Sequence, residues 1–403
     1  MRSFDLLTPA QAMSKLRAAM DAAPRPLPYE SVPTDGARDR VLAADIVSPV
    51  AMPEFRRSTV DGYAVKAAST PGVLRVTGEV RMGEAAPLVI KAGEAALVHT
   101  GGNVPDGADA VVMLEQTQPL DPAPAKIQTV ARLAAGENVI QAGEDVAAGE
   151  AVARAGTRLR EQEIAGLLSL GMTRVNVLRH PRVALIASGD ELVAPDRPTG
   201  PGQVRNTNAP MLAALVRRHG GAPIVFDPLP DQRAAFSAAA ERAMTEADMV
   251  IFIAGSSVGA RDFVPDTVAA MGAPGVIAHG IAFRPGKPTL FALADGKPVL
   301  GLPGNPISAL VTAILFAMPV LGWVQGVRNP VQPGQRRATL AAEVKSPRDL
   351  EQWLPVRLAG DTATVINTKS NLIFGLVRAD GMICLPIGVE RLEAGSTVDV
   401  LLL

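Results

Sequence analysis

The sequence has few of the residues that build soft-metal sites or nucleic-acid surfaces. Its one cysteine, Cys384, excludes an intrachain disulfide and a cysteine-based metal site. The four histidines are scattered without metal-ligand spacing, so any bound metal would be a hard cation held by carboxylates and substrate oxygens. Aromatic residues make up only 3% of the chain, and 39 basic residues face 40 acidic ones. These values argue against base stacking and against a basic nucleic-acid surface.

Long uninterrupted apolar runs are also missing. Glycine, proline or charge breaks each run well before the ~20 residues that a membrane span needs. The first residues, MRSFDLLTPAQAMSKL, lack the apolar core of a signal peptide. We therefore expect a cytoplasmic protein without a membrane contact.

The pattern of short elements changes along the chain. Thr8-Pro9-Ala10-Gln11 is a capping box that predicts a helix to about Ala22. From 58 to about 140, short strands separated by glycine turns predict a β-rich region, and LREQEIAGLLSLGM predicts a helix that stops at Gly171. After residue 329, short strands indicate a small all-β domain.

Residues 181–329 alternate buried strands with helices, for example RVALIASGDEL followed by NTNAPMLAALVRRHGG. This alternation predicts a doubly wound parallel α/β domain, whose ligands bind at the carboxyl ends of the strands. Asn206 or Asn208 is the expected cap of the first of these helices.

The stretch VLGLPGNPISAL (299–310) predicts a tight connection from a strand to a helix. Asn305 fits the N-cap and Pro306 the first helical position, while Gly301 and Gly304 permit a positive φ. A helix that starts this way offers N–H groups to an anion, although ordinary turns use the same residues.

Three other turns of the α/β domain carry unusual chemistry. They are SGDEL (188–192), AGSSVGARD (254–262) and RPGKP (284–288). Four such turns at one sheet edge combine N–H donors, cations and carboxylates, which suits a phosphorylated ligand with a divalent cation. On the residues alone, a hydrolase acting on a nucleotide phosphoanhydride would fit.

Six segments in order resemble the MoeA family, the molybdopterin molybdenumtransferases that include the gephyrin E domain. These segments are STVDGYAV (58–65), HTGGNVPDGADAVVMLE (99–115), AGEDVAAGE (142–150), ASGDEL (187–192), RPGKP and GLPGNPISA (301–309). The resemblance implies four domains: an elongated α+β connecting domain (1–45 with 144–180), a β-rich domain (46–143), the α/β molybdopterin-binding domain (181–329) and a C-terminal β domain (330–403). It also implies insertion of molybdate into adenylylated molybdopterin with Mg²⁺ and release of AMP.

The resemblance further implies a homodimer whose site is shared between subunits, with the β-rich domain of one chain completing the cleft of the other. Transient contact with molybdoenzymes or their chaperones would follow. The implied catalytic residues are Asp61, Thr100, Glu191 and Asp262, with Asp61, Glu191 and Asp262 also as metal ligands. The implied ligand-binding residues are Asp145, Ser188, Gly189, Asp190, Asp231, Gly255, Ser256, Ser257, Arg284, Gly286, Lys287, Pro303, Gly304, Asn305, Pro306 and Ser370.

Several of these residues also have an ordinary structural explanation. Asp61 could be only the first residue of an Asp-Gly turn, Asp231 and Asp262 could cap helices, and Lys287 could lie in a solvated loop. The segment AGSSVG is one residue shorter than is common in the family, and arginines are missing before Gly143. A non-catalytic relative that binds the cofactor as a scaffold or delivers it is therefore the alternative.

Overall fold

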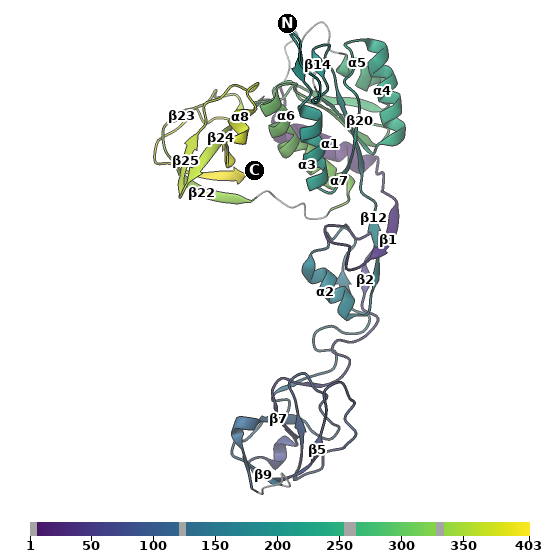
Figure 1. Cartoon of the computed structure of the whole chain (residues 1–403), viewed down its shortest axis with the longest axis vertical. Coiled ribbons are helices and arrows are strands. Elements are labelled where there is room, and N and C mark those ends of the chain that lie inside the picture. The colour runs from purple at the N-terminus through teal and green to yellow at the C-terminus, as the bar shows by residue number, and fades with distance from the viewer. Residues whose placement is uncertain (1–5, 121–125, 254–262, 328–333) are drawn as a thin grey trace.

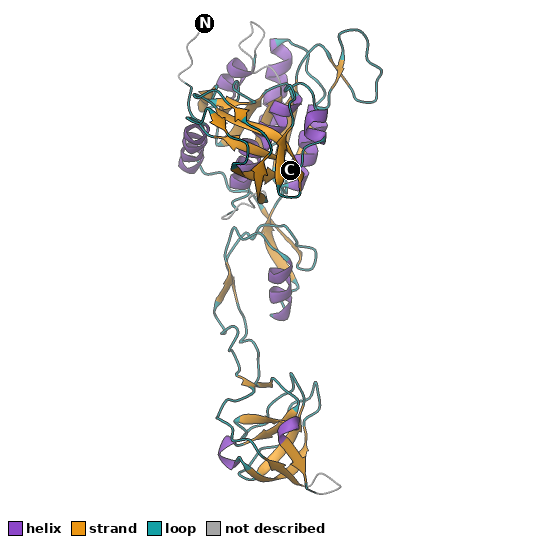
Figure 2. Cartoon of the chain, turned by 90° about the vertical axis from the view of Figure 1, so that its left-hand side faces the viewer, coloured by secondary structure: helices purple, strands orange, loops and turns teal. Residues whose placement is uncertain are grey.

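The computed structural model describes residues 6–120, 126–253, 263–327 and 334–403. The chain is elongated (Figures 1 and 2). An α/β domain and a small β domain lie at one end, a β-rich domain lies at the other end, and a narrow connecting region joins them.

The α/β domain contains a six-stranded sheet in the order β16-β13-β17-β21-β20-β18. Its four parallel strands are β16 (Ala222–Val225), β13 (Arg182–Ala187), β17 (Met249–Ile253) and β21 (Lys297–Leu302). β17 and β21 are buried throughout because helices cover both faces of the sheet. On one face pack α1 (Pro9–Ala22), α3 (Asn208–Arg218), α6 (Pro306–Thr312) and α7 (Met318–Val324), and on the other pack α4 (Arg233–Glu246) and α5 (Val264–Met271).

Two strands of this sheet are absent from the sequence prediction. β18 (Pro274–His279) pairs antiparallel with β20 (Leu290–Ala294), which in turn pairs antiparallel with β21. Two reversals make β18 run in the same direction as β21. The connection from β18 to β20, which contains RPGKP, therefore lies at the same sheet edge as the carboxyl ends of the parallel strands.

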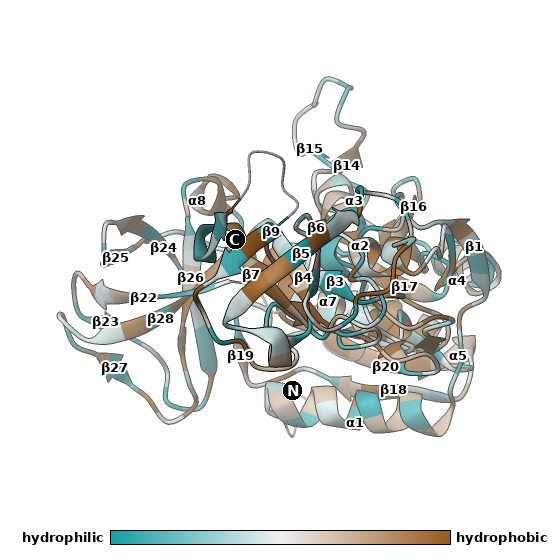
Figure 3. Ribbon diagram, turned by 90° about the horizontal axis from the view of Figure 1, so that it is seen from below, coloured by the Kyte–Doolittle hydropathy of each residue, from teal (hydrophilic) through white to brown (hydrophobic). Residues whose placement is uncertain are grey.

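The N-terminal helix α1 has the predicted capping box. Thr8 Oγ1 accepts from the N–H of Gln11 at 3.2 Å, and Gln11 Oε1 accepts from the N–H of Thr8 at 2.9 Å. However, Ala12 and Leu16 are fully buried in the core of the α/β domain, and α1 lies along β18 and β20 (Figure 3). The helix therefore packs with the α/β domain, although the predicted boundary places it in the connecting domain.

The helical run Pro306–Val324, which includes a π-helical turn (Ala313–Ala317), is long and apolar enough to cross a membrane. Two thirds of it (67%) is buried inside the protein. Its side chains belong to the core beneath the sheet, so the run is accounted for as a core helix.

The connecting region contains α2 (Glu161–Ser169) and two small antiparallel pairs. These pairs are β1 (Tyr29–Pro33) with β12 (Arg174–Leu178), and β2 (Ile46–Val47) with β11 (Ala151–Ala153). Gly171 follows α2 with φ 75°, as the sequence predicts.

The β-rich domain has its own six-stranded sheet in the order β7-β4-β6-β5-β9-β8. Its strands are β4 (Gly62–Val65), β5 (Gly72–Glu79), β6 (Glu94–Val98), β7 (Ala110–Met113), β8 (Thr117–Pro119) and β9 (Lys126–Thr129). A short pair, β3 (Arg57–Ser58) with β10 (Val139–Ile140), ties its ends together.

The C-terminal domain closes into a small barrel because β24 pairs with both β25 and β26. The barrel strands are β22 (Gln335–Leu340), β24 (Glu351–Ala359), β25 (Thr362–Val365), β26 (Gly381–Leu385) and β28 (Thr397–Leu402). A minor pair, β23 (Val344–Lys345) with β27 (Arg391–Leu392), and the short helix α8 (Phe374–Val377) lie beside it. The short strand β19 (Phe283–Arg284) of the α/β domain pairs with β24, so the RPGKP turn is fixed against the barrel.

Candidate functional site

A cleft of about 750 Å³ lies at the carboxyl edge of the α/β sheet. Its walls come from the ends of β13, β17 and β21, the start of α3, the start of α6 and the segment before α8. Of the predicted site residues, this cleft brings together Ser188, Glu191, Pro303, Gly304, Asn305 and Pro306. The turns after β13 and β21, which are distant in the sequence, therefore meet as the parallel-sheet prediction requires.

A neighbouring cleft of about 610 Å³ lies between the α/β domain and the C-terminal barrel. It is lined by the predicted residues Arg284, Gly286, Lys287 and Ser370, and it shares Pro303 and Asn305 with the first cleft. The two form a continuous groove, which we call the carboxyl-edge groove. The exposed side chains of Arg284 and Lys287 place two cations in the barrel-facing part.

The strand-to-helix turn GLPGNP has the predicted N-cap position and first helical residue, but not the predicted side-chain cap. Asn305 is the N-cap residue of α6 and Pro306 is its first residue. The Asn305 side chain makes no capping hydrogen bond, and its Nδ2 donates to Ser370 Oγ at 3.0 Å. The carbonyl of Ser370 accepts from the N–H of Ile307 at 3.1 Å, so this first-turn donor is used by the barrel domain.

Neither Gly301 nor Gly304 adopts the positive φ that the sequence permits. Gly301 lies inside the extended strand β21, and neither residue is among the described glycines with positive φ. The glycine that the groove requires is Gly286. Its φ is 130°, and a Cβ there would lie 2.4 Å from Cγ2 of Thr312, so a side chain would be both strained and obstructed.

The SGDEL turn orients one carboxylate into the groove. Gly189 has φ 147°, and a Cβ there would lie 2.6 Å from Glu191 Oε2, so the carboxylate packs directly over this glycine. Asp190 Oδ1 accepts from the N–H of Asp231 at 3.1 Å, which links the turn after β13 to the segment before α4. Asp231 is not the helix cap that the sequence allowed, because Gln232 is the N-cap residue of α4.

The sequence predicts Asn206 or Asn208 as the cap of α3, and the structure gives these two asparagines of the groove different roles. Thr207, between them, is the N-cap residue of α3, and the Asn206 side chain accepts a long hydrogen bond (3.4 Å) from the N–H of Ala209. Asn208 Nδ2 donates to the carbonyl of Gly304 at 2.7 Å and so joins α3 to the strand-to-helix turn. Asn208 Oδ1 is buried without a partner among the described residues, which leaves an acceptor that a ligand N–H could satisfy.

Asp61 and Thr100 form a second polar cluster, in the β-rich domain. Asp61 Oδ1 accepts from the Thr100 N–H at 2.8 Å and from its hydroxyl at 3.2 Å. His99 Nδ1 lies 3.9 Å from the same oxygen, and His99 Nε2 lies 2.8 Å from Glu79 Oε1. The hydrogen bond from the Thr100 N–H is the largest cause that lowers the pKa of Asp61, and the Thr100 hydroxyl and His99 act in the same direction.

This second cluster is remote from the carboxyl-edge groove of the same chain. The β-rich domain lies at the opposite end of the molecule (Figure 1). Asp145 is also outside the groove, in an exposed turn beside α2, where its N–H donates to the carbonyl of Met52 at 3.0 Å. Within one chain, therefore, the predicted site residues fall into separate groups.

The predicted residues Gly255, Ser256, Ser257 and Asp262 lie outside the described residues. Within the described ranges, no group of three or more His, Cys, Asp or Glu side chains is arranged to hold a metal ion. A complete protein cage for a metal is thus not present in that part of the chain.

The sequence matches three protein-family profiles in succession. Residues 7–171 match the "MoeA N-terminal region (domain I and II)", residues 184–323 the "Probable molybdopterin binding domain", and residues 337–403 the "MoeA C-terminal region (domain IV)". Molybdopterin molybdenumtransferase 2 of Mycobacterium tuberculosis (strain H37Rv) is 33% identical over 97% of this chain and 98% of its own length. Molybdopterin molybdenumtransferase of Staphylococcus epidermidis (strain RP62A) is 31% identical over 91% of this chain and 90% of its own length.

Solved structures show the same architecture. The molybdopterin biosynthesis moeA protein of Pyrococcus horikoshii OT3 superposes with a TM-score of 0.83, at 29% identity, over 99% of this chain and 100% of that chain. A second crystal structure, titled as a molybdopterin biosynthesis moea protein from the same genus, gives a TM-score of 0.81 at 32% identity and covers 99% of both chains.

Proposed function

The chain belongs to the MoeA family, and from this premise we propose that it is a molybdopterin molybdenumtransferase of molybdenum cofactor biosynthesis. It would insert molybdate into adenylylated molybdopterin and release AMP. The observation that carries the proposal is the nearly full-length match to relatives named as transferases, together with family matches to all parts of the chain. This coverage favours a catalyst over a non-catalytic scaffold or delivery protein.

The carboxyl-edge groove supplies the contacts that such a substrate needs. Its two parts, of about 750 and 610 Å³, are in the range of small-molecule sites and can accommodate a pterin and a nucleotide end to end. Arg284 and Lys287 can neutralise phosphate or molybdate oxygens. The unpartnered Oδ1 of Asn208 can accept from an N–H of a heterocycle in the other part.

The groove fits a Mg²⁺ ion that is shared with the substrate. Mg²⁺ usually binds one or two carboxylates together with substrate phosphates and waters. Glu191 is the described carboxylate on the groove wall, and we propose it as a ligand together with Asp262. When bound, the ion would neutralise the charge that develops on the phosphoanhydride.

We further propose that the site is completed by a second subunit in a homodimer. Asp61 and Thr100 cannot reach Glu191 of the same elongated chain, so the family's site residues come together only across two chains. Because Thr100 lowers the pKa of Asp61, this carboxylate stays ionised at neutral pH. Such a group is better suited to hold a cation or orient a water molecule than to take up a proton.

The test is to incubate the purified protein with adenylylated molybdopterin, molybdate and Mg²⁺, and to measure AMP and active cofactor. We expect molybdate-dependent AMP release that disappears in excess EDTA and returns when Mg²⁺ is added in excess. Glu191→Gln is the matched inactive control. Absence of AMP above the control level, with the substrate still bound, would support the scaffold alternative instead. Cytoplasmic location is part of the proposal, and cell fractionation would check it.

A further inference from the structure

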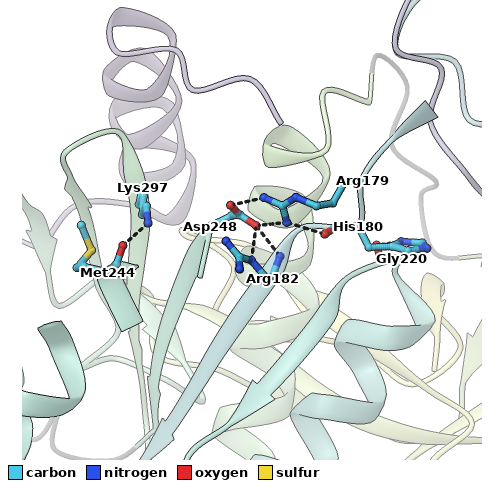
Figure 4. Close-up of polar contacts among 7 residues, drawn as sticks. All are labelled: Arg179, His180, Arg182, Gly220, Met244, Asp248 and Lys297. Carbon is cyan, nitrogen blue, oxygen red and sulfur yellow. Dashed lines mark hydrogen bonds and ion pairs between the residues drawn. The ribbon is translucent and has the colours of Figure 1, made fainter. Parts of the chain in front are cut away.

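A third cavity, of about 690 Å³, lies at the opposite edge of the α/β sheet. It is formed where β13, β17 and β21 begin, at Arg182, Asp248 and Lys297, and it is closed by the end of α1, by residues 24–28 and by the end of α7. We call it the strand-start pocket. It lies at the opposite end of the strands from the carboxyl-edge groove, and the proposed reaction does not use it. Figure 4 shows three of its charged residues at the strand starts, Arg182, Asp248 and Lys297.

The strand-start pocket has an excess of positive charge. Its charged lining residues are Arg17, Arg25, Arg179, Arg182 and Lys297, together with Asp21 and Asp248. Arg179 holds Asp248 through two hydrogen bonds of 2.8 and 2.9 Å, and Arg17 Nε lies 2.9 Å from Asp21. These pairs use both carboxylates. The Arg182 guanidinium reaches Asp248 only at 3.9 Å, and Arg25 and Lys297 have no carboxylate partner among the described residues.

Lys297 is the most informative of these groups because it is only 4% exposed. Its ammonium donates to the carbonyl of Met244 and keeps two further N–H donors (Figure 4). Desolvation lowers the pKa of Lys297, and the nearby charge of Arg25 adds to this. The charge of Asp248 acts in the opposite direction but does not reverse the shift.

Helix ends offset part of the positive charge. The C-terminal ends of α1, α4 and α7 lie near the strand-start pocket, and each carries about −0.5 elementary charge. Five cations and two carboxylates give +3 (5 − 2), so a net of roughly +1.5 remains. The remainder of the lining, apart from Thr245, is non-polar and includes Leu27 and Trp323, and the Arg17 guanidinium lies 5.3 Å from the Trp323 ring centroid.

We propose that the strand-start pocket binds a small phosphorylated organic anion. The phosphate lies against Lys297, Arg182 and Arg25, and the organic part packs on Leu27 and Trp323. The ligand supplies the negative charge that the chain lacks there, and the buried ammonium gains acceptors for its free N–H groups. This assignment is independent of the reaction proposed for the carboxyl-edge groove.

The two tryptophans of the chain allow a test that reports each region separately. Trp323 lines the strand-start pocket and Trp353 lines the carboxyl-edge groove. The full-length Trp353→Phe variant leaves Trp323 as the only tryptophan reporter, and Trp323→Phe leaves Trp353. Each is titrated with inorganic pyrophosphate and with ADP at constant ionic strength, because salt screens charged sites.

We expect a saturable change of Trp323 emission, with a dissociation constant below about 1 mM and tighter binding of ADP than of pyrophosphate. Lys297→Met in the same background should weaken binding at least about tenfold, since an apolar chain of similar length keeps the packing but removes the charge. Arg182→Gln, at a side chain that is 46% exposed, gives the same test without a change in the core. Arg284→Gln, in the groove, is the matched control and should leave the Trp323 titration unchanged.

Several results would overturn the assignment. These are a Trp323 response that never saturates, or one that chloride reproduces at equal ionic strength. Unchanged affinity in both Lys297→Met and Arg182→Gln would exclude a phosphate contact with these residues. Loss of the signal in Arg284→Gln would move the ligand to the groove, and equal affinities for ADP and pyrophosphate would exclude an organic ligand.

Discussion

Two inactive variants of the chain can restore each other if the active site is shared between subunits. Asp61→Asn keeps an Oδ1 that can accept the 2.8 Å hydrogen bond from the Thr100 N–H, so the turn and the fold should survive. Asp61 is also largely exposed, and Glu191→Gln is isosteric at an exposed turn. Each substitution thus removes one charge and little else. We expect each variant alone to release AMP at least about 10²-fold more slowly than the wild type, with the melting temperature nearly unchanged.

The expected recovery follows from the symmetry of the dimer. In a mixed dimer, one site contains both substitutions and the other contains neither, because each site takes Asp61 from one chain and Glu191 from the other. Random mixing at equal concentrations makes half of the dimers mixed, so total activity should rise to about one quarter of wild type. Mixed dimers purified with two different affinity tags should reach about one half.

The assay is AMP release after subunit exchange or co-expression, with the dimer verified by light scattering. The control combines Glu191→Gln with Arg284→Gln, which both lie in the α/β domain and therefore leave no wild-type site in a mixed dimer. If purified mixed dimers of Asp61→Asn and Glu191→Gln stay as inactive as either parent, the shared site is refuted. A fully active monomer would refute it as well.

Three further predictions follow from single positions. Gly286→Ala should lower the free energy of unfolding by about 2 kcal/mol, because φ is 130° and the new Cβ would lie 2.4 Å from a side-chain methyl of α6. Gly166→Ala, in α2, meets no neighbour and should raise the free energy of unfolding by about 0.5–1 kcal/mol. Urea unfolding measures both changes. Cys384, whose pKa is raised to about 12 by burial, should react with Ellman's reagent at pH 8 only on unfolding, and rapid labelling of the native protein would contradict this. Burial raises the pKa of Asp248, but the hydrogen bonds from the Arg179 guanidinium and the Arg182 N–H, together with the charges of both arginines, outweigh burial and lower the pKa. The stability that this carboxylate provides is therefore present above the ordinary pKa of aspartate and is lost as the pH falls through the lowered pKa. Asp248→Asn should cost about 2 kcal/mol at pH 7 and flatten the acid limb of the stability profile.

The sequence predicts best the elements that short-range chemistry determines. The capping box at Thr8 and the glycine stop at Gly171 involve residues only a few positions apart, and both have the predicted geometry. The parallel strands are continuous apolar runs because helices cover both faces of the sheet, so they are also predictable. β18 begins with proline and glycine, which are typical of turns, and β20 is an apolar run of five residues, which periodicity alone does not assign to a strand.

Side-chain roles at the groove depend on contacts between distant segments. Asn305 is predicted from the sequence as a helix cap, but its Nδ2 donates to Ser370 Oγ of the C-terminal domain at 3.0 Å, so the side chain contributes to the interface between the two domains. Asn208 likewise binds Gly304, which lies on another strand-to-helix turn. In both cases the side-chain Nδ2 donates to a tertiary partner, and the local capping hydrogen bond that composition suggests is not made. The barrel itself closes because β24 pairs on both sides, which no local pattern specifies.

The two halves of the proposed site differ in how far sequence reasoning can reach them. Strands that run in parallel end at one edge, so the order of strands and helices along the chain is enough to assign the polar turns after β13 and β21 to the same groove. The pairing of Asp61 with Thr100 instead depends on the antiparallel register of β4 and β6, in which Gly62 faces Val98 and the flanking residues meet. In this register His99 is the residue opposite Asp61, and Thr100 lies one position beyond it, where its N–H reaches Asp61 Oδ1. If the site is shared as proposed, joining that cluster to Glu191 requires a second chain, because the connecting region keeps the β-rich domain away from its own groove.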